Sequence, residues 1–459
     1  MHLDTDWGNV ARATGGTLLR GDVRDPFSSI STDSRKLEGS PAFWALKGEK
    51  FDAHSFLDEK LASACGGWVV RAGAALPAAL PAHVLTVADT RAALADLAAW
   101  HRGRFTVPVV GVTGTNGKTT VKEMIRAILS RKGPVCATTG NFNNEVGLPL
   151  SVLELSTDTR FAVFEMGASR EGDIRALARV AKPTVGVVTN VGPAHLEFFG
   201  DLETVFKTKS EMIEALPPDG RAVLPCDDPW LSKLLPRLGA RAVTFGRTEA
   251  ADVRIPDEEP VLRGTARELA LLVRGRRITF SGELFGSIHR LNAAAAAAAA
   301  LALGLDADAV AAGLADFRPA PLRFALRKHA SGASFVVDAY NANPGSMRAG
   351  IETFLETAPG TERIVVLGDM KELGTGSADL HRELGAWLGT LPLAGAFLAG
   401  PEMRHAADAA KAMGARYPVR HEPEASRFAP ELRGRLGPQT AVYFKASRAM
   451  RFEALIEGL

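Results

Sequence analysis

Cysteine is scarce in this chain of 459 residues, which has only Cys65, Cys136 and Cys226. Their number is odd and they lie far apart, so they form neither a disulfide framework nor the spacing of a zinc site. A reducing compartment is the usual setting for such a chain, and we expect the protein in the cytoplasm.

An excess of charge of one sign is also missing. Lys and Arg number 54 and Asp and Glu number 52, which gives a net charge of +2. Without a basic surplus or a polybasic block, we expect no nucleic-acid partner and no attraction to a membrane surface.

Long hydrophobic runs are absent as well. The first residues lack the basic start and apolar core of a secretory signal. The most apolar stretch, 291–305, is mostly alanine and is too short to span a bilayer. We therefore expect a surface-packed alanine-rich helix there, and no membrane span.

What the chain does have is a globular composition, with 46% hydrophobic and 23% charged residues. Its length corresponds to about three domains at roughly 150 residues each. Forty-five glycines and 26 prolines punctuate short apolar runs that alternate with helical patterns, which is typical of βαβ units and parallel sheets. The sequence predicts an α/β protein with domains at 1–106, 107–318 and 319–459.

The expected elements differ between these three parts. In the first part we predict strands at 43–46, 68–70 and 84–87 and a helix at 90–104. In the second we predict strands at 107–112, 161–165, 184–189, 222–224 and 242–245, a one-faced helix at 119–130, and an antiparallel pair at 268–273 and 277–283. After a linker at 316–321, strands at 334–338, 363–368, 396–399 and 441–445 alternate with helices and predict a doubly wound sheet.

The strongest chemical signal is the segment 111–120, GVTGTNGKTT, between an apolar strand and an amphipathic helix. Glycines there let backbone N–H groups approach phosphate oxygens, and the helix N-terminus favours negative charge. Lys118 can bridge the β- and γ-phosphates, and the hydroxyl of Thr119 can bind Mg²⁺. The strict phosphate-loop pattern would have glycine where Val112 stands. The residues assigned to ATP in this loop are Gly114, Thr115, Asn116, Gly117, Lys118, Thr119 and Thr120.

Two further residues fit a magnesium-dependent nucleotide site. Glu165 ends a predicted strand, and His195 follows another. Taken singly, each has an ordinary structural explanation, a solvated carboxylate or a hydrogen-bonded loop histidine. Their order after a phosphate loop favours the functional interpretation, since Mg²⁺ prefers oxygen ligands.

The segment 113–120, TGTNGKTT, resembles the nucleotide loop of the Mur ligases and the folylpolyglutamate synthases. The segments 141–149, 164–168, 189–197 and 207–211 are similar to further Mur ligase motifs. The resemblance implies a carbamylated lysine, for which Lys209 competes with Lys207. The positions of Glu211 and Met212 favour Lys209. It also implies ATP and Mg²⁺, with Lys118, Lys209, His195 and Glu165 as catalytic residues and Thr119, Glu165, His195 and the Lys209 carbamate as metal ligands.

The C-terminal part carries a loop at 338–347, DAYNANPGSM. It looks like the loop of those Mur ligases that add D-alanyl-D-alanine to a muramoyl tripeptide. Similar motifs follow at 366–374, with His381 beyond it, and at 445–448, where Ala446 replaces the family's usual glycine. The resemblance implies an acceptor loop of Tyr340, Asn341 and Asn343, and further ATP contacts from Asn292, Arg323 and Asp338.

The N-terminal part resembles the UDP-sugar-binding domain of the same family through the segments 32–35, 43–48 and 52–56. The segment 40–43, SPAF, departs from the family pattern. A guanidinium group fits phosphate oxygens well, so Arg35 is a candidate for the diphosphate. The residues implied for the UDP substrate are Ser34, Arg35, Lys47 and Gly48.

The family resemblance implies an ATP-dependent ligase that forms ADP and phosphate. It would join D-alanyl-D-alanine to UDP-N-acetylmuramoyl-tripeptide through an acyl phosphate, a step of peptidoglycan synthesis. The alternatives are another ligase of this fold such as a folylpolyglutamate synthase, a phosphate-loop NTPase switch, and a nucleotide-sugar-binding protein with an inactive ATP site. We expect small-molecule substrates only, and a monomer.

Overall fold

The computed structural model describes residues 3–48, 51–193, 196–258, 261–263, 266–283, 286–358 and 360–459. The chain divides into two compact units. Unit 1 comprises Met1–Gly111, Gly133–Gly167 and Asp173–Thr184, and unit 2 comprises Val112–Lys132, Ala168–Gly172 and Val185–Leu459. The three expected domain boundaries stay a prediction.

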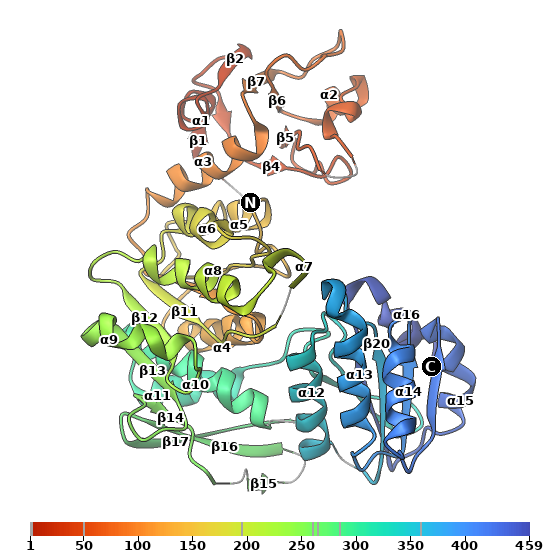
Figure 1. Cartoon of the computed structure of the whole chain (residues 1–459). Coiled ribbons are helices and arrows are strands. Elements are labelled where there is room, and N and C mark those ends of the chain that lie inside the picture. The colour runs from red at the N-terminus through yellow and green to blue at the C-terminus, as the bar shows by residue number, and fades with distance from the viewer. Residues whose placement is uncertain are drawn as a thin grey trace. The chain divides into compact units, whose positions relative to one another are not determined.

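Unit 1 contains a five-stranded sheet in the order β2-β7-β6-β5-β4, parallel except for β2 (Figure 1). Helix α3 begins after Asp89, whose side chain accepts hydrogen bonds from two backbone N–H groups of the first turn. Its apolar side is buried, as the spacing predicted. The strands are β1 (Thr5–Asp6), β2 (Thr17–Arg20), β3 (Pro26–Phe27), β4 (Ile30–Ser31), β5 (Ala42–Trp44), β6 (Gly67–Arg71), β7 (His83–Val87), β9 (Val135–Ala137) and β10 (Phe161–Glu165). The helices are α1 (Trp7–Thr14), α2 (Glu59–Ala64), α3 (Thr90–Arg102), α5 (Gly147–Val152) and α6 (Asp173–Ala181), with a 3₁₀ turn η1 (Ala53–Phe56).

Strand β8 (Val109–Thr113) leads into helix α4 (Lys118–Ser130). The strand is fully buried, and α4 buries its predicted apolar side, which includes Met124, Ile125 and Ile128. The strand, the four-residue turn and the helix agree with the sequence prediction to within two residues at each end.

Unit 2 begins with a parallel series β11-β12-β13-β14, to which β16 adds in the antiparallel sense. Strands β16 and β17 form the expected antiparallel pair. The strands are β11 (Val185–Val188), β12 (Arg221–Pro225), β13 (Ala242–Gly246), β14 (Val253–Arg254), β15 (Val261–Arg263), β16 (Ala266–Val273) and β17 (Arg276–Glu283). The helices are α7 (Leu196–Phe199), α8 (Leu202–Glu214), α9 (Leu235–Leu238), α10 (Ser287–Ala302) and α11 (Ala307–Asp316), with 3₁₀ turns η2 (Leu231–Leu234) and η3 (Gly239–Arg241).

The alanine-rich helix α10 corrects one expectation. A surface-packed helix was predicted at 291–305, but residues 293–300 are all at most 1% exposed. Helix α10 lies against α4 and against strands β12 and β13. Methyl side chains allow this close approach on all sides, so a helix of alanines is here an interior element.

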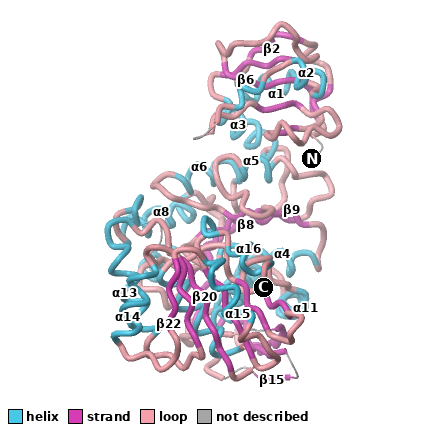
Figure 2. Tube along the Cα trace, turned by 90° about the vertical axis from the view of Figure 1, so that its right-hand side faces the viewer, coloured by secondary structure: helices cyan, strands magenta, loops and turns pink. Residues whose placement is uncertain are grey.

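The C-terminal part of unit 2 is a six-stranded sheet in the order β18-β19-β23-β20-β21-β22, parallel except at the β18 edge. Helices α12, α13 and α14 cover one face, and α15 and α16 cover the other (Figures 1 and 2). This is the predicted doubly wound sheet. The strands are β18 (Ala325–Lys328), β19 (Ser334–Val337), β20 (Glu362–Gly368), β21 (Gly395–Ala399), β22 (Val419–Glu422) and β23 (Thr440–Lys445). The helices are α12 (Pro344–Thr357), α13 (Ser377–Leu388), α14 (Met403–Ala412), α15 (Ala429–Arg433) and α16 (Phe452–Glu457), with 3₁₀ turns η4 (Gly374–Gly376), η5 (Ala425–Phe428) and η6 (Arg448–Met450).

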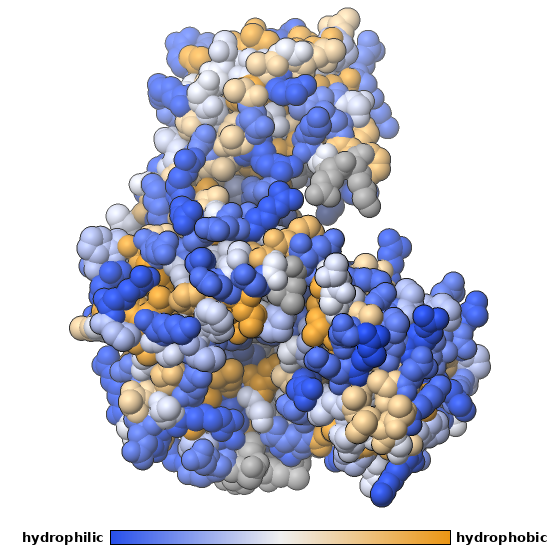
Figure 3. All heavy atoms as spheres, in the orientation of Figure 1, coloured by the Kyte–Doolittle hydropathy of each residue, from blue (hydrophilic) through white to orange (hydrophobic). Residues whose placement is uncertain are grey.

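Within the described parts of the chain, no helix combines the length and the apolar character needed to cross a membrane. Hydrophilic side chains cover most of the face drawn in Figure 3, and hydrophobic ones gather there only in small groups.

Candidate functional site

The phosphate loop is shaped by two glycines. Gly114 has φ 139° and Gly117 has φ 82°, conformations that favour glycine. A Cβ on Gly114 would lie 2.0 Å from Thr189 Oγ1. No side chain caps α4, so its first N–H groups are available to an anion. The turn is therefore suited to hold phosphate oxygens at a helix N-terminus.

The end of β11 and the residues after it anchor this loop. Asn190 donates to the carbonyl oxygen of Asn116 at 3.1 Å and accepts from its N–H at 3.0 Å. Thr189 also donates to the carbonyl oxygen of Asn116, at 2.6 Å. The hydroxyl of Thr115 exchanges hydrogen bonds with Gly192. The loop thus keeps its shape through polar contacts on several of its backbone groups.

Lys118 is the first residue of α4, and its ammonium group donates to the carbonyl oxygens of Gly114 (2.7 Å) and Thr115 (3.0 Å). The side chain therefore lies along the loop itself. Thr119 follows in the first turn, where its hydroxyl accepts a hydrogen bond from Arg323 at 3.2 Å.

Arg323 approaches the loop from a turn with unusual backbone angles. The residues on either side of it, Leu322 and Phe324, have φ values of 62° and 54°. The guanidinium group of Arg323 lies over the ring of Tyr340, 3.9 Å from its centroid. Arg323 therefore joins the phosphate loop to the loop 338–347.

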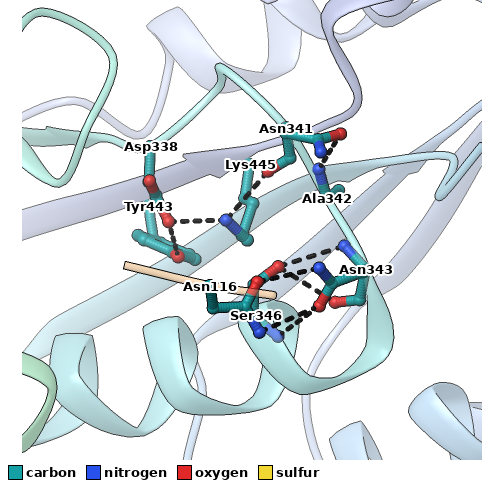
Figure 4. A network of polar contacts seen from close by, with 8 residues as sticks. All are labelled: Asn116, Asp338, Asn341, Ala342, Asn343, Ser346, Tyr443 and Lys445. Atoms are coloured by element: carbon teal, nitrogen blue, oxygen red, sulfur yellow. Dashed lines mark hydrogen bonds and ion pairs between the residues drawn. The ribbon is translucent and has the colours of Figure 1, made fainter. Parts of the chain in front are cut away.

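A pair of amides makes a second connection between these two loops. Asn343 Nδ2 donates to Asn116 Oδ1 at 2.8 Å, and Asn116 Nδ2 lies 3.5 Å from Asn343 Oδ1 (Figure 4). Asn343 is also the N-cap of α12, where it exchanges hydrogen bonds with Ser346 in a capping box. Asn343 is consequently held in place from both sides.

Asp338, the first residue of the same loop, belongs to a cluster of polar side chains with Tyr443 and Lys445. Asp338 Oδ2 accepts from the ammonium group of Lys445 at 2.6 Å and from the hydroxyl of Tyr443 at 2.9 Å (Figure 4). Lys445 also donates to the carbonyl oxygen of Asn341 at 3.0 Å. Burial lowers the pKa of Lys445 and raises the pKa of Tyr443. The ion pair with Asp338 compensates for burying the Lys445 charge.

Helix α10 brings Asn292 to the phosphate loop, where a Cβ on Gly117 would lie 2.4 Å from Asn292 Oδ1. His289, one turn earlier on α10, is buried, and desolvation lowers its pKa to about 4. Its ring meets that of Phe324 edge to face, with 5.3 Å between the centroids. His289 is therefore an uncharged part of the interior.

The two other C-terminal motifs form tight turns after their strands. His381 is buried, and its Nε2 accepts from the backbone N–H of Met370 at 3.1 Å while its Nδ1 lies 2.8 Å from the carbonyl oxygen of Ser377. Desolvation lowers the pKa of His381, which favours the neutral ring that this pattern requires. Ala446 is buried without a positive φ, so its turn does not need the family's glycine.

In unit 1, Glu165 stands at the end of β10 and is buried. Its Oε1 accepts from Asn143 at 2.7 Å, and its backbone N–H donates to the hydroxyl of Thr138 at 2.9 Å. Its Oε2 is buried and has no hydrogen-bond partner among the described residues. A buried carboxylate oxygen with this vacancy fits a magnesium ligand.

No group of three or more His, Cys, Asp or Glu side chains could hold a metal ion within the described ranges. A magnesium ion that binds through one carboxylate, one hydroxyl, phosphates and water needs no such group. Residue 195, the expected metal-binding histidine, lies outside the described residues.

The two candidate lysines of α8 differ in their surroundings. Lys209 is buried, and its ammonium group lies 5.6 Å from the centroid of the Phe199 ring. Lys207 is exposed and forms an ion pair with Glu203 at 2.9 Å. The geometry therefore distinguishes an interior lysine from a solvated one.

Of the N-terminal candidates in unit 1, Arg35, Lys47 and Gly48 are exposed and Ser34 is half-buried. Arg35 forms a two-contact ion pair with Asp33, at 2.8 and 2.9 Å, beside Ser34. Arg91 of α3 donates to the carbonyl oxygen of Lys47 at 2.8 Å. Gly48 donates to the carbonyl oxygen of residue 51 at 2.8 Å.

A glycine-bounded loop between a buried strand and a helix, beside a doubly wound sheet, defines a mononucleotide-binding enzyme of the α/β class. Residues 112–300 match the model of the Mur ligase middle domain, and residues 322–448 match the Mur ligase glutamate ligase domain. The chain belongs to the Mur ligase family, as its motifs predicted.

Two curated relatives match most or nearly all of this chain. The UDP-N-acetylmuramoyl-tripeptide–D-alanyl-D-alanine ligase of Bacillus subtilis is 34% identical over 461 aligned positions, which cover 98% of this chain and 97% of that protein. The ligase of the same name from Escherichia coli is 35% identical and covers 81% of this chain and 80% of its own length.

Solved structures of MurF also resemble this chain over nearly its whole length. A crystal structure of MurF from Acinetobacter baumannii has a TM-score of 0.88 and 32% identity, and covers 99% of this chain and 98% of that one. MurF ligase from Thermotoga maritima in complex with ADP has a TM-score of 0.82 and 33% identity, over 94% of this chain and 96% of that one. These likenesses confirm the predicted mixed α/β fold with parallel sheets.

Proposed function

We propose that this chain is an ATP-dependent ligase that joins D-alanyl-D-alanine to UDP-N-acetylmuramoyl-tripeptide. The similar proteins over nearly the whole length bear the name of this activity. The observation that carries the proposal is the contact of the phosphate loop with the loop 338–347, through Asn116 and Asn343. This contact puts the nucleotide loop next to the loop whose motif indicates the acceptor dipeptide.

The reaction has two steps. The free carboxylate of the tripeptide attacks the γ-phosphorus of ATP, which gives an acyl phosphate and ADP. The amine of D-alanyl-D-alanine then attacks the acyl carbon, loses a proton, and expels inorganic phosphate to leave an amide. Both steps need the reacting groups to be held in line and the phosphoryl charge to be stabilised.

Lys118 and the N–H groups at the start of α4 would meet the phosphates. The Lys118 ammonium group lies 2.7 Å from the carbonyl oxygen of Gly114, so it stands at the loop where the phosphates would bind. Arg323, beside Thr119, adds a second positive group at the same loop. Fixed charges of this kind stabilise the transferring phosphoryl group without reorganisation.

Thr119, Glu165, His195 and a carbamate on Lys209 are the residues that would hold Mg²⁺, which neutralises phosphate charge when it is bound. The unpartnered Oε2 of Glu165 supports this assignment. The burial of Lys209 supports its modification, because a carbamate replaces a buried ammonium group with two oxygen ligands.

For the UDP-linked substrate we propose Ser34, Arg35, Lys47 and Gly48. Arg35 has a side chain that is 85% exposed, so its guanidinium group can exchange Asp33 for a diphosphate. Asn341 and Asn343 would orient the acceptor, since their amides can donate and accept. We further propose that the protein works as a cytoplasmic monomer on small molecules alone.

The test is phosphate release with each substrate omitted in turn. We expect release only when ATP, Mg²⁺, the UDP-linked tripeptide and D-alanyl-D-alanine are all present. L-alanyl-L-alanine should react far more slowly, because inverted centres exchange methyl and polar directions in a shaped site. Vigorous release with ATP alone would indicate an NTPase, equal turnover with glutamate another ligase of the fold, and none under any condition an inactive ATP site.

A further inference from the structure

Tyr443 is a tyrosine in the interior of β23 whose hydroxyl reaches a carboxylate. The residue is fully buried, and its hydroxyl donates to Asp338 Oδ2 at 2.9 Å. Lys445 donates to the same oxygen at 2.6 Å. Asp338 Oδ1 has no hydrogen-bond partner within the described chain, and the Asp338 side chain is 14% exposed. Tyr443 and Lys445 thus hold Asp338 Oδ2 in place, while Oδ1 can bind a ligand.

Gly350 makes the space for this hydroxyl. It lies inside α12, and a Cβ at this position would lie 1.9 Å from Tyr443 Oη, 3.0 Å from Tyr443 Cζ and 3.4 Å from Asp338 Oδ2. Glycine within a helix costs about 1 kcal/mol relative to alanine. Glycine at position 350 therefore leaves room for the hydroxyl of Tyr443, a residue far away in the sequence.

The ring of Tyr443 has a second contact with the nucleotide site. It stacks on Phe354 with 5.4 Å between centroids and meets Phe324 at 5.7 Å. Phe324 has φ 54° and directly follows Arg323, which donates to Thr119 of the phosphate loop. A non-glycine residue with such a φ persists only where its surroundings hold it.

We propose that Tyr443 is a positioning residue of the nucleotide site, and that Gly350 leaves the space for its hydroxyl. Its hydroxyl orients Asp338, and its ring supports the turn that presents Arg323 to the phosphate loop. The inference rests on the proposed function in taking ATP as the nucleotide, and on Asp338 and Arg323 as the ATP contacts that the family resemblance implies. Tyr443 itself does not touch the substrate; it determines where Asp338 and Arg323 stand.

Tyr443→Phe tests the hydroxyl and leaves the ring in place. We expect the KM for ATP and the Kd for ADP to rise about three- to tenfold, because a hydrogen bond to a charged group is lost while Lys445 keeps its own. We expect kcat and the KM for D-alanyl-D-alanine to stay within about twofold.

The matched control is Tyr417→Phe. Tyr417 is also buried in this domain, and its hydroxyl donates to the carbonyl oxygen of Leu388, away from Asp338. Both variants lose a buried tyrosine hydroxyl, so both should lose some thermal stability. Only Tyr443→Phe should weaken nucleotide binding, which separates positioning from a general loss of stability.

A second arm uses Gly350→Ala, which places a methyl group where the hydroxyl lies. In the wild-type background it should lower the thermal midpoint and raise the KM for ATP at least as much as Tyr443→Phe does. In the Tyr443→Phe background the severe contact with the hydroxyl is gone and the Cβ meets ring Cζ at 3.0 Å, so the same change should lower the thermal midpoint much less and leave the KM of that variant nearly unchanged. The smaller loss of thermal midpoint in the double variant, a non-additive effect, is the signature of the pair.

The proposal is overturned if Tyr443→Phe binds ADP as the wild type does, or if Gly350→Ala acts equally in both backgrounds. Should Tyr443→Phe fail to fold, Gly350→Ala alone decides: normal ADP affinity in that variant would also overturn the proposal. Failure of the proposed function is distinguishable, because the wild type would then lack dipeptide-dependent phosphate release before any variant is made.

Discussion

The side chain of Asn292 covers Gly117 so closely that a Cβ at Gly117 would lie 2.4 Å from Asn292 Oδ1. Gly117 also has φ 82°, so alanine there would meet both a contact and an unfavourable backbone angle. We expect Gly117→Ala to weaken ADP binding about tenfold or more, as measured by calorimetry. Gly437→Ala is the control, since a Cβ at Gly437 meets nothing within 4 Å. Unchanged ADP affinity in Gly117→Ala would contradict the assignment of this loop.

Lys118→Ala should abolish turnover and keep the fold. Its ammonium group donates to two carbonyl oxygens of its own loop, and alanine suits the first turn of a helix. We expect phosphate release to fall by about two to three orders of magnitude, with an unchanged thermal midpoint. Lys132→Ala, at an exposed position beyond the other end of α4, should match the wild type. A folded Lys118→Ala variant with normal release would refute the phosphate-loop assignment.

Lys209→Ala should lose nearly all activity, and short carboxylates such as acetate should partly restore it. Lys207→Ala should be mild, because its ion pair with Glu203 lies on the surface, where water screens it and it contributes little. Phosphate release with and without added carboxylate is the measurement. Equal losses in the two variants, or no response of Lys209→Ala to acetate, would count against the carbamate.

Stability should fall when the pH is lowered from neutral. Burial lowers the pKa of His289 from its ordinary value of 6.5 to about 4, so the unfolded chain binds a proton more readily than the folded one between these values. The stabilisation is complete above about pH 6.5 and is lost as the pH falls towards 4, by about 3 kcal/mol for this group. Burial lowers the pKa of His101 and His381 in the same direction.

Urea unfolding of the wild type and of His289→Gln between pH 7.5 and 5 measures this effect. The variant should show a smaller decrease of the unfolding free energy over that range. His405→Gln, which changes a partly exposed histidine of α14, is the control and should keep the wild-type slope. An unchanged slope in His289→Gln would contradict the prediction.

Much of the fold could be predicted from the sequence wherever a local pattern determines it. The strand at 161–165 coincides with β10, and the antiparallel pair β16 and β17 was expected within three residues at each end. Strand β18, in contrast, has the exposed basic end Arg327–Lys328 and shows no buried alternation; β22 also ends in charged residues. Edge strands of this kind are stabilised by pairing that no single segment displays.

The candidate site followed the same division. The phosphate loop could be found because strand, turn and helix are contiguous. The close packing of Gly350 and Tyr443 could not be predicted from the sequence, because the two residues are distant in sequence and each has an ordinary local explanation. The burial of the alanines in α10 was predicted wrongly for a related reason: alanine is compatible with surface and interior, and only the packed neighbours decide between them.

The alanine stretch of α10 affects the phosphate loop, because the same helix carries Asn292. Helix α10 carries Asn292 at the start of a run that is enclosed between α4 and the strands β12 and β13. Larger side chains in the run would push the helix outwards, and glycine would loosen it. The alanine methyl groups therefore set the distance between α10 and its neighbours. That distance determines how closely the Asn292 amide approaches Gly117 of the phosphate loop.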